Sequence, residues 1–252
     1  MSWWTDLYDD TLAAWMLHRA PPEEGARTVA FLRQLGLLHP GSRVFDQGCG
    51  PGRLIAPLCQ AGAVVSGIDL MPAYIESARQ KAVLAGQRPV GFQVGDITQV
   101  ASPSPVDLVL SWWTCLGYAD DDATNALPLA RAFDSLRPGG AYAIDTLHTP
   151  GVLRAFVPVS DTETPTPDGP VHLRRTSRLD VDRGVLHKAW AFVLPDGRQR
   201  TVHSKVRLYM PHEWRRMLEA AGFVDITAYG DLAASPLQPD SPRLILVARR
   251  PT

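Results

Sequence analysis

Between residues 43 and 147, short apolar runs alternate with segments whose hydrophobic residues recur at helical spacing. The alternation predicts strands at 44–45, 64–68, 90–97, 106–111 and 141–147, and helices at 53–61, 71–86 and 123–137. Strands and helices that follow each other at this spacing favour a mostly parallel sheet covered by helices on both faces.

Helical segments precede this alternation, and a run of strands interrupts it. Hydrophobic residues from Trp4 to Leu17 recur near helical spacing, and a second helix is predicted from about Glu23 to Leu35. Residues 161–170 are rich in proline, threonine and acid, which predicts an exposed loop. Antiparallel strands joined at 182–184 and 195–197 are expected within 171–209, followed by a helix at 211–223 and strands at 224–229 and 244–250.

These elements predict an α/β fold, in which a doubly wound, mostly parallel seven-stranded sheet carries an antiparallel β insertion between its fifth strand and the last helix. The expected parts are an N-terminal helical lid (1–40), an α/β core (41–150), the insertion (151–210) and a C-terminal segment that completes the core sheet (211–252). By its position, the insertion either roofs an acceptor pocket or pairs with another subunit as a homo-oligomer.

Composition and charge exclude several classes of partner. The 252 residues carry a formal net charge of -1 and no basic tract, which argues against nucleic acid. The apolar runs are too short to span a bilayer, and the N-terminus lacks the features of a signal peptide. The three cysteines have no CxxC spacing, which favours a reducing compartment. We therefore expect a cytoplasmic protein with no membrane partner.

The most specific motif is DQGCGPG at residues 46–52, which lies between a predicted strand and a predicted helix. Glycines at such a turn allow positive φ and let a ligand approach bare backbone. The turn does not match a phosphate-binding Walker A loop, because no GK[ST] follows it. It also differs from the NAD fingerprint, since its glycines give GxGxG with Arg53 in the next position.

The stretch VFDQGCGPGRL resembles the D-x-G-x-G-x-G motif of class I S-adenosylmethionine-dependent methyltransferases. Further matches follow in order: Asp69 after the second strand, Asp96 after the third, VDLVLSWWTCLGY, and LRPGGAYAID before the fifth strand. The resemblance covers about Val29 to Leu147 and is closest to a small-molecule subgroup with an antiparallel sheet insertion. It implies a Rossmann-like methyltransferase fold, S-adenosyl-L-methionine as cofactor and S-adenosyl-L-homocysteine as product.

The resemblance assigns cofactor contacts by position. Asp69 would hold the ribose hydroxyls through charge-assisted hydrogen bonds, and Asp96 or its backbone would meet the adenine. The full expected set is Tyr8, Asp46, Gly48, Cys49, Gly50, Gly52, Asp69, Leu70, Met71, Asp96, Ile97, Ser111 and Trp112. Purely structural roles stand beside these: Asp46 organising the turn, Asp69 capping a strand end, and Asp96 turning the chain.

Catalytic and acceptor-binding residues are less distinctive. Tyr8 matches an aromatic that closes over the methionine end of the cofactor in related enzymes, and His148 could act as a base or orient an acceptor. The expected acceptor-binding set is Trp4, Trp15, Trp113, Tyr118, His148, Arg154, Trp190 and Tyr209. Packing alone explains the N-terminal tryptophans equally well, and His148 is equally typical of a surface or capping position.

Two short motifs have structural interpretations. The acids at 120–122 precede a helix and are expected to cap it rather than hold a metal, so no metal is predicted. Trp112 and Trp113 are adjacent at the end of a strand, where neighbouring side chains point to opposite faces. We expect one indole to pack into the core and the other, Trp113, to border the pocket.

The chemistry predicted is methyl transfer to a small organic acceptor, of the kind found in secondary metabolism. N-methylation is favoured because no catalytic base is evident in the sequence, and a neutral amine needs none. O-methylation of a small metabolite is the close alternative. A protein that binds the cofactor for non-methyl chemistry, or without catalysis, is the more distant one.

Overall fold

A computed structural model of the chain describes residues 3–8, 22–166 and 168–252. Its main sheet has seven strands in the order β10-β11-β5-β4-β1-β2-β3. The strands are β1 (Arg43–Gln47), β2 (Val64–Asp69), β3 (Phe92–Val94), β4 (Val106–Ser111), β5 (Leu136–Thr146), β10 (Val224–Tyr229) and β11 (Leu244–Arg249). Neighbouring strands from β1 to β5 are parallel, whereas β11 is antiparallel to both β5 and β10. The predicted seven-stranded, mostly parallel sheet is confirmed.

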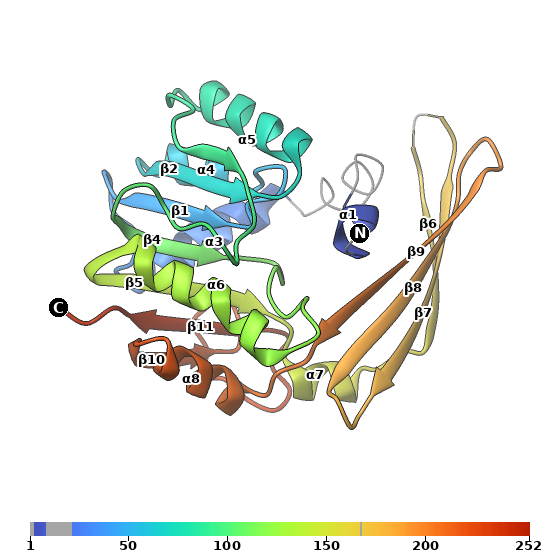
Figure 1. Cartoon of the computed structure of the whole chain (residues 1–252). Helices are drawn as coiled ribbons and strands as arrows, with labels where there is room; N and C mark the ends of the chain where they lie inside the picture. Colours follow the sequence, from blue (N-terminus) through green and yellow to red (C-terminus); the bar gives the residue numbers. More distant parts are fainter. Residues whose placement is uncertain (1–2, 9–21, 167) are drawn as a thin grey trace.

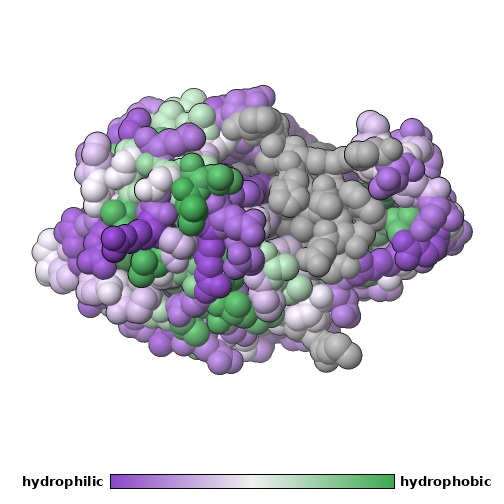
Figure 2. Space-filling view, turned by 90° about the horizontal axis from the view of Figure 1, so that it is seen from above, coloured by the Kyte–Doolittle hydropathy of each residue, from purple (hydrophilic) through white to green (hydrophobic). Residues whose placement is uncertain are grey.

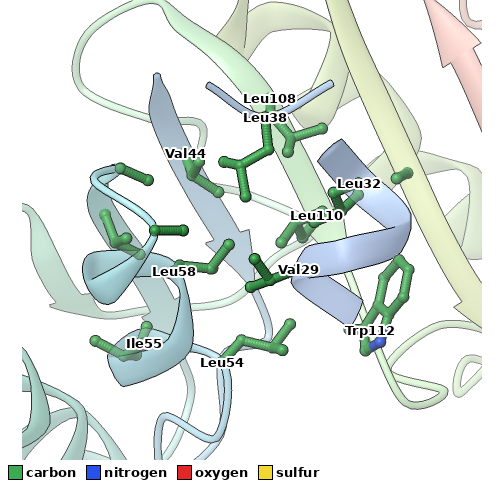
Figure 3. Close-up of a cluster of buried hydrophobic side chains, with 14 of the residues drawn as sticks. Val29, Leu32, Leu38, Val44, Leu54, Ile55, Leu58, Leu108, Leu110 and Trp112 are labelled. Carbon is green, nitrogen blue, oxygen red and sulfur yellow. The ribbon is translucent and has the colours of Figure 1, made fainter. Parts of the chain in front are cut away.

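Helices cover both faces of this sheet (Figure 1). One face is packed by α3 (Pro22–Gln34), α4 (Ile55–Gln60) and α5 (Pro72–Leu84), and the other by α6 (Asp122–Ser135) and α8 (Pro211–Ala220). Successive strand residues serve opposite layers: Val44 belongs to the first core and Phe45 to the second. Figure 3 shows the first core, where Val29, Leu54 and Leu110 meet between α3, α4 and the sheet. Burial on both faces explains why adjacent strand residues such as Val44 and Phe45 are both apolar.

A separate four-stranded antiparallel sheet lies between β5 and α8 in the sequence. It contains β6 (Val159–Thr164), β7 (Val171–Asp180), β8 (Val185–Val193) and β9 (Gln199–Arg207), and α7 (Thr149–Arg154) precedes it. The β7–β8 and β8–β9 connections lie at the turns expected at 182–184 and 195–197. The antiparallel insertion is therefore confirmed.

Strand β3 is shorter than the predicted 90–97, and two further regions differ from expectation. Residues 161–164 belong to β6 rather than to a loop, because Asp161 and Glu163 face solvent and pair across the strands with Arg174 and His172. Cross-strand charge pairs compensate for the poor strand propensity of acidic residues. In addition, α6 ends at Ser135 and β5 begins at Leu136, so the Arg-Pro-Gly-Gly segment is part of the strand.

The N-terminal helix α1 (Trp3–Leu7) lies between the core and the four-stranded sheet (Figure 1). Leu7 is buried in a cluster with Val171, Trp190 and Phe192 of that sheet, and Trp3 and Tyr8 pack against the same cluster. The Arg200 Nη2 group donates to the Asp6 carbonyl oxygen at 2.5 Å. The insertion therefore holds the N-terminal aromatics in place. The remainder of the helix predicted as far as Leu17 lies outside the described residues.

Within the described ranges, no helix combines the length and apolar character that crossing a membrane requires. Figure 2 shows the face seen from above, where hydrophilic side chains cover most of the coloured surface and hydrophobic ones form small separate groups.

Candidate active site

The glycine turn after β1 is built as the sequence motif requires. Gly48, Gly50 and Gly52 have φ values of 77°, 54° and 80°, a region that residues with a Cβ rarely adopt. A Cβ at Gly48 would lie 2.9 Å from Cys115 Cβ, whereas one at Gly50 would meet nothing within 4 Å. The backbone at Gly50 therefore borders open space that a ligand can enter.

Asp69, at the end of β2, connects this turn to the next helix. The Gly50 N–H donates to Asp69 Oδ2 at 2.8 Å, and the Met71 N–H donates to Oδ1 at 3.0 Å. Burial raises the pKa of Asp69, and these backbone hydrogen bonds oppose the rise. Each carboxylate oxygen keeps a second lone pair for a ligand. Asp69 thus caps the strand end and also presents its carboxylate to the cavity.

A cavity of about 240 Å³ lies along the turn, Asp69 and the loops that follow β3 and β4. It brings together most of the predicted cofactor residues, namely Tyr8, Gly48, Cys49, Gly50, Asp69, Leu70, Met71, Asp96, Ile97 and Trp112. From the predicted acceptor-binding set, Trp4, Trp113 and Tyr118 line the same cavity. This is the carboxyl edge of the parallel strands, where open α/β sheets bind ligands.

Three predicted cofactor residues lie behind the cavity wall. Asp46 is buried beneath the turn, and Gly52 gives α5 room to approach, since a Cβ there would lie 2.9 Å from Ala78 Cα. The Ser111 hydroxyl donates to Gln47 Oε1 at 2.8 Å and contacts the Tyr142 hydroxyl, also at 2.8 Å, inside the core. The side chain of Ser111 therefore supports the sheet and does not line the cavity.

Four of the predicted acceptor residues also lie away from the cavity lining. His148 is buried, and its Nδ1 atom is 3.0 Å from the Ser241 carbonyl oxygen. Arg154 donates to the Asp240 carbonyl on the surface, while the Tyr209 hydroxyl donates to Asp122 Oδ1 at 2.6 Å. Trp190 packs in the four-stranded sheet. The last residue of the predicted set, Trp15, lies outside the described residues.

The acids at 120–122 have structural roles. Asp121 is the N-cap of α6 and accepts from the Thr124 N–H at 2.7 Å, which confirms the capping prediction for that residue. Asp120 pairs with Lys205, and Asp122 accepts from Tyr209. In the part of the chain that the structure describes, no three His, Cys, Asp or Glu side chains are grouped as metal ligands.

An aromatic wall lines one side of the cavity, and we define it as Trp4, Tyr8 and Tyr118, with Trp3 packed against Tyr118 outside the lining. The Tyr8 and Tyr118 hydroxyls lie 2.6 Å apart, and Tyr118 donates in turn to the Thr114 carbonyl. The Trp3 and Tyr118 ring centroids are 4.8 Å apart. Burial raises the pKa of Tyr8 to about 12, so its phenol stays protonated near neutral pH. The aromatic wall offers ring faces and hydroxyls without negative charge.

Three charged residues from separate elements, Glu24, Asp145 and Arg243, hold Trp113 in place, and none of them was predicted. The backbone of Trp113 has φ 55° and that of Thr114 has φ 60°, an uncommon conformation for non-glycine residues. The Trp113 N–H donates to Asp145 Oδ2 at 3.2 Å, and its indole Nε1 donates to Glu24 Oε1 at 3.1 Å. Arg243 closes the ring by pairing with Glu24 at 2.9 Å and with Asp145 at 3.3 Å.

These contacts explain why Trp112 and Trp113 differ in burial and in surroundings. Trp112 is 3% exposed and packs near Phe31 in the first core, although it also reaches the cavity. Trp113 is partly exposed, and the Arg53 guanidinium lies 3.6 Å from its ring centroid. Arg53 also lines the cavity, and its position directly after the glycine motif is the signal that sequence reasoning overlooked.

Two buried carboxyls make the stability of the fold depend on pH. Burial, reinforced by the nearby Asp69 charge, raises the pKa of Asp46 to about 7, and burial raises that of Asp145 to about 6. Because both values exceed the ordinary value near 4, the folded chain takes up protons between pH 8 and 5 that the unfolded chain does not. The free energy of unfolding should therefore rise by roughly 1–3 kcal/mol as the pH falls from 8 to 5.5.

Urea unfolding at these two pH values measures this rise. Asp46→Asn should remove about half of it or more, because it deletes the group with the higher folded-state pKa. If the free energy of unfolding of a folded Asp46→Asn protein rises as much as that of the wild type, Asp46 is ionised in the folded protein without a raised pKa.

Comparison with known proteins agrees with this geometry. Residues 44–140 match the family model described as a methyltransferase domain. A malonyl-[acyl-carrier protein] O-methyltransferase of Serratia marcescens is 31% identical over 119 residues, which are 45% of this chain and 41% of that protein. A ubiquinone biosynthesis O-methyltransferase of Xanthomonas campestris is 33% identical over 112 residues, which are 43% of this chain and 44% of the relative. The matched region thus spans less than half the length of these curated relatives.

Solved structures resemble nearly the whole fold. The CcbJ methyltransferase from Streptomyces caelestis superimposes with a TM-score of 0.77 at 20% identity, covering 99% of this chain and 96% of that one. The S-adenosylmethionine-bound CalS10, an amino pentose methyltransferase from Micromonospora echinaspora, gives 0.69 at 20% identity, covering 92% and 93%. The sugar N-methyltransferase KedS8 from Streptoalloteichus sp. gives 0.70 at 19% identity, covering 92% and 87%.

Four observations agree on a methyltransferase fold: the order of the motifs, the order of the strands, the glycine turn bonded to Asp69 and the matched methyltransferase domain. Residues 44–140 therefore match a methyltransferase domain, and nearly the whole chain has a Rossmann-like methyltransferase fold.

Proposed function

We propose that this chain transfers a methyl group from S-adenosyl-L-methionine to a small organic acceptor, with nitrogen as the favoured acceptor atom. The observation that carries the proposal is the hydrogen bond from the Gly50 N–H to Asp69 Oδ2, which places a carboxylate beside bare glycine backbone on the wall of a cavity. The donor set fits the cofactor, since hydroxyls suit a carboxylate and a sulfonium suits ring faces.

Each side of the cavity has a separate task. Asp69 would accept hydrogen bonds from the ribose hydroxyls, and Asp96, whose Oδ1 already accepts from Thr98, would meet the adenine with its free oxygen or backbone. The aromatic wall would exclude water from the reacting centre and place the acceptor against the cofactor. When bound, the cofactor supplies an activated methyl group, so the protein's contribution is chiefly alignment, which can account for roughly 7–11 kcal/mol of the barrier.

Nitrogen is favoured because the described lining offers no evident base apart from Asp69 and Asp96, the two carboxylates assigned to the cofactor. Tyr8 and Tyr118 are phenols whose pKa values burial raises, and His148 is not part of the lining. A neutral amine needs no base to attack, whereas an alcohol does. Two of the structural neighbours are a sugar N-methyltransferase and a glycopeptide N-methyltransferase. The curated relatives from Serratia and Xanthomonas are O-methyltransferases, which keeps oxygen as the alternative.

The test incubates the full chain with methyl-labelled S-adenosylmethionine and a panel of small amines, phenols and carboxylic acids, followed by mass spectrometry. The proposal expects labelled product from an amine, with formation of S-adenosylhomocysteine. If phenols or carboxylic acids become labelled and the amines do not, the acceptor atom is oxygen rather than nitrogen. No labelled product from any of these acceptors, with the cofactor bound, would contradict the proposed activity.

A conservative change in the aromatic wall separates catalysis from packing. Tyr8→Phe removes only the hydroxyl that contacts Tyr118 and leaves the ring in place. We expect turnover to fall about fivefold or more while the melting temperature changes by only a few degrees, because one partly buried hydrogen bond is worth ~1 kcal/mol. Steady-state kinetics and thermal unfolding of the same sample measure both. Parallel losses in turnover and stability would indicate that Tyr8 is only a packing residue.

A further inference from the structure

The two faces of the four-stranded sheet differ in charge. Strand pairing places every acid of these strands (Asp161, Glu163 and Asp180) on the outer face, where two of them pair with Arg174 and His172. The opposite, inner face packs against α1 through Trp190, Phe192 and Val202. The inner face of the described strands therefore carries cations and hydroxyls but no carboxylate.

Four inner-face residues surround one indole, and we call Arg175, Ser177, Lys188 and Ser204 the inner patch. Ser177, Lys188 and Ser204 are directly opposite one another on β7, β8 and β9, and Arg175 is opposite Trp190. Arg175 Cζ and Lys188 Nζ lie 5.7 Å and 5.6 Å from the Trp190 ring centroid, and the Trp190 Nε1 group donates to Ser204 Oγ at 2.9 Å. Both serines are more than nine-tenths buried.

Among the described residues, the two cations of the inner patch have no acidic partner. Across the residues that the structure describes, no ion pair joins Arg175 or Lys188 to an acid. Burial, together with the neighbouring Arg175 charge, lowers the pKa of Lys188 to about 8. Contact with the ring face of Trp190 is favourable for a cation but does not neutralise two of them. A bound anion would stabilise two partly buried positive charges of this kind. The neighbouring serine hydroxyls could donate hydrogen bonds to it.

The inner patch is within reach of the candidate active site. The Arg207 N–H on β9 donates to the carbonyl of Gly117, which lines the cavity, at 2.8 Å. Ser204 precedes Arg207 by three residues on the strand, a separation of about 10 Å. Tyr8 connects the two regions as well, because it lines the cavity and packs against the cluster that contains Trp190.

We propose that the inner patch binds an anionic group of the methyl acceptor, a carboxylate or a phosphate, beside the cavity. Arg175 and Lys188 supply the charge, and the Ser177 and Ser204 hydroxyls supply neutral hydrogen bonds. This assignment rests on the proposed methyl transfer and narrows its substrate class to small molecules that carry both an acceptor atom and an anion.

The test uses inorganic pyrophosphate and malonate as probes, titrated by calorimetry into the full chain in the presence of excess S-adenosylhomocysteine. The wild-type protein should bind at least one probe with a Kd in the millimolar range. Tighter binding of pyrophosphate assigns the patch to a phosphate group, and tighter binding of malonate to a carboxylate. Arg175→Gln and Lys188→Gln should each weaken binding about tenfold, and thermal unfolding checks that both variants fold.

Arg178→Gln is the matched control, because Arg178 lies on the same strand as Arg175 but on the outer face. It should change the Kd by less than about twofold. The assignment would be overturned if Arg178→Gln and Arg175→Gln weakened probe binding equally, or if the wild-type protein bound neither probe. Binding of S-adenosylhomocysteine is measured in a separate titration. If the wild-type protein does not bind S-adenosylhomocysteine, the proposed function is contradicted, while the probe titrations still report on the inner patch.

Discussion

Asp69→Asn is expected to weaken binding of S-adenosylhomocysteine by about 10- to 150-fold, equivalent to roughly 1.5–3 kcal/mol. The substitution keeps the side-chain size, and the amide oxygen can still accept from Gly50 or Met71. It removes the charge that strengthens hydrogen bonds to a pair of ligand hydroxyls. Calorimetric titration of the wild-type and variant proteins measures the effect directly.

Asp231→Asn is the matched control for this variant. Asp231 also accepts from two backbone N–H groups, those of Ala233 and Ser235, but lies outside the cavity lining. Its substitution should leave the Kd unchanged within about twofold. If Asp69→Asn protein folds normally and binds the ligand as tightly as the wild type, Asp69 is only a strand-end cap.

Arg243→Met should lower the free energy of unfolding at pH 7.5 by about 3–5 kcal/mol, because it leaves a buried acid without its partner. Asp145 is 4% exposed, and Glu24 would lose the same cation. The loss should shrink at pH 5.5, since burial already raises the pKa of Asp145 to about 6 and protonation then removes the uncompensated charge.

Urea unfolding at both pH values tests this prediction. Arg216→Met, on the exposed side of α8 and away from these acids, should change stability by less than about 0.5 kcal/mol. A loss that is the same at pH 7.5 and 5.5 would exclude Asp145 charge as the cause. A loss below about 1 kcal/mol would show that the ring of contacts around Trp113 contributes little to the fold.

Hydrophobic periodicity predicted the fold because each signal in it is local. The apolar run from Leu108 to Leu110 indicated a strand buried on both faces, and the alternation in 171–209 indicated a sheet with one wet face. The β6 strand was missed because its acids are stabilised by partners on β7, which no local pattern contains. The glycine turn was predictable because positive φ requires glycine almost regardless of context.

The remainder of the site depends on contacts between residues distant in the sequence. Trp113 is positioned by Glu24, 89 residues away, and by Asp145, 32 residues away. The sequence predicted which side chains suit the chemistry, but not that His148 and Tyr209 turn into the interior, because their partners Ser241 and Asp122 are set by the tertiary fold. The charge asymmetry of the four-stranded sheet likewise follows from strand register, which is known only once the strands are paired.

Calorimetric titration of S-adenosyl-L-methionine into the full chain tests the central claim most directly. The structure predicts one binding site with a Kd near or below about 10 µM, a free energy of roughly -7 to -8 kcal/mol. The same titration with Gly50→Val should give a Kd at least about tenfold weaker, because the added side chain would extend into the open space beside the turn. Absence of binding by the folded wild-type protein at about 1 mM ligand, or equal binding by Gly50→Val, would contradict the assignment of this cavity to the cofactor.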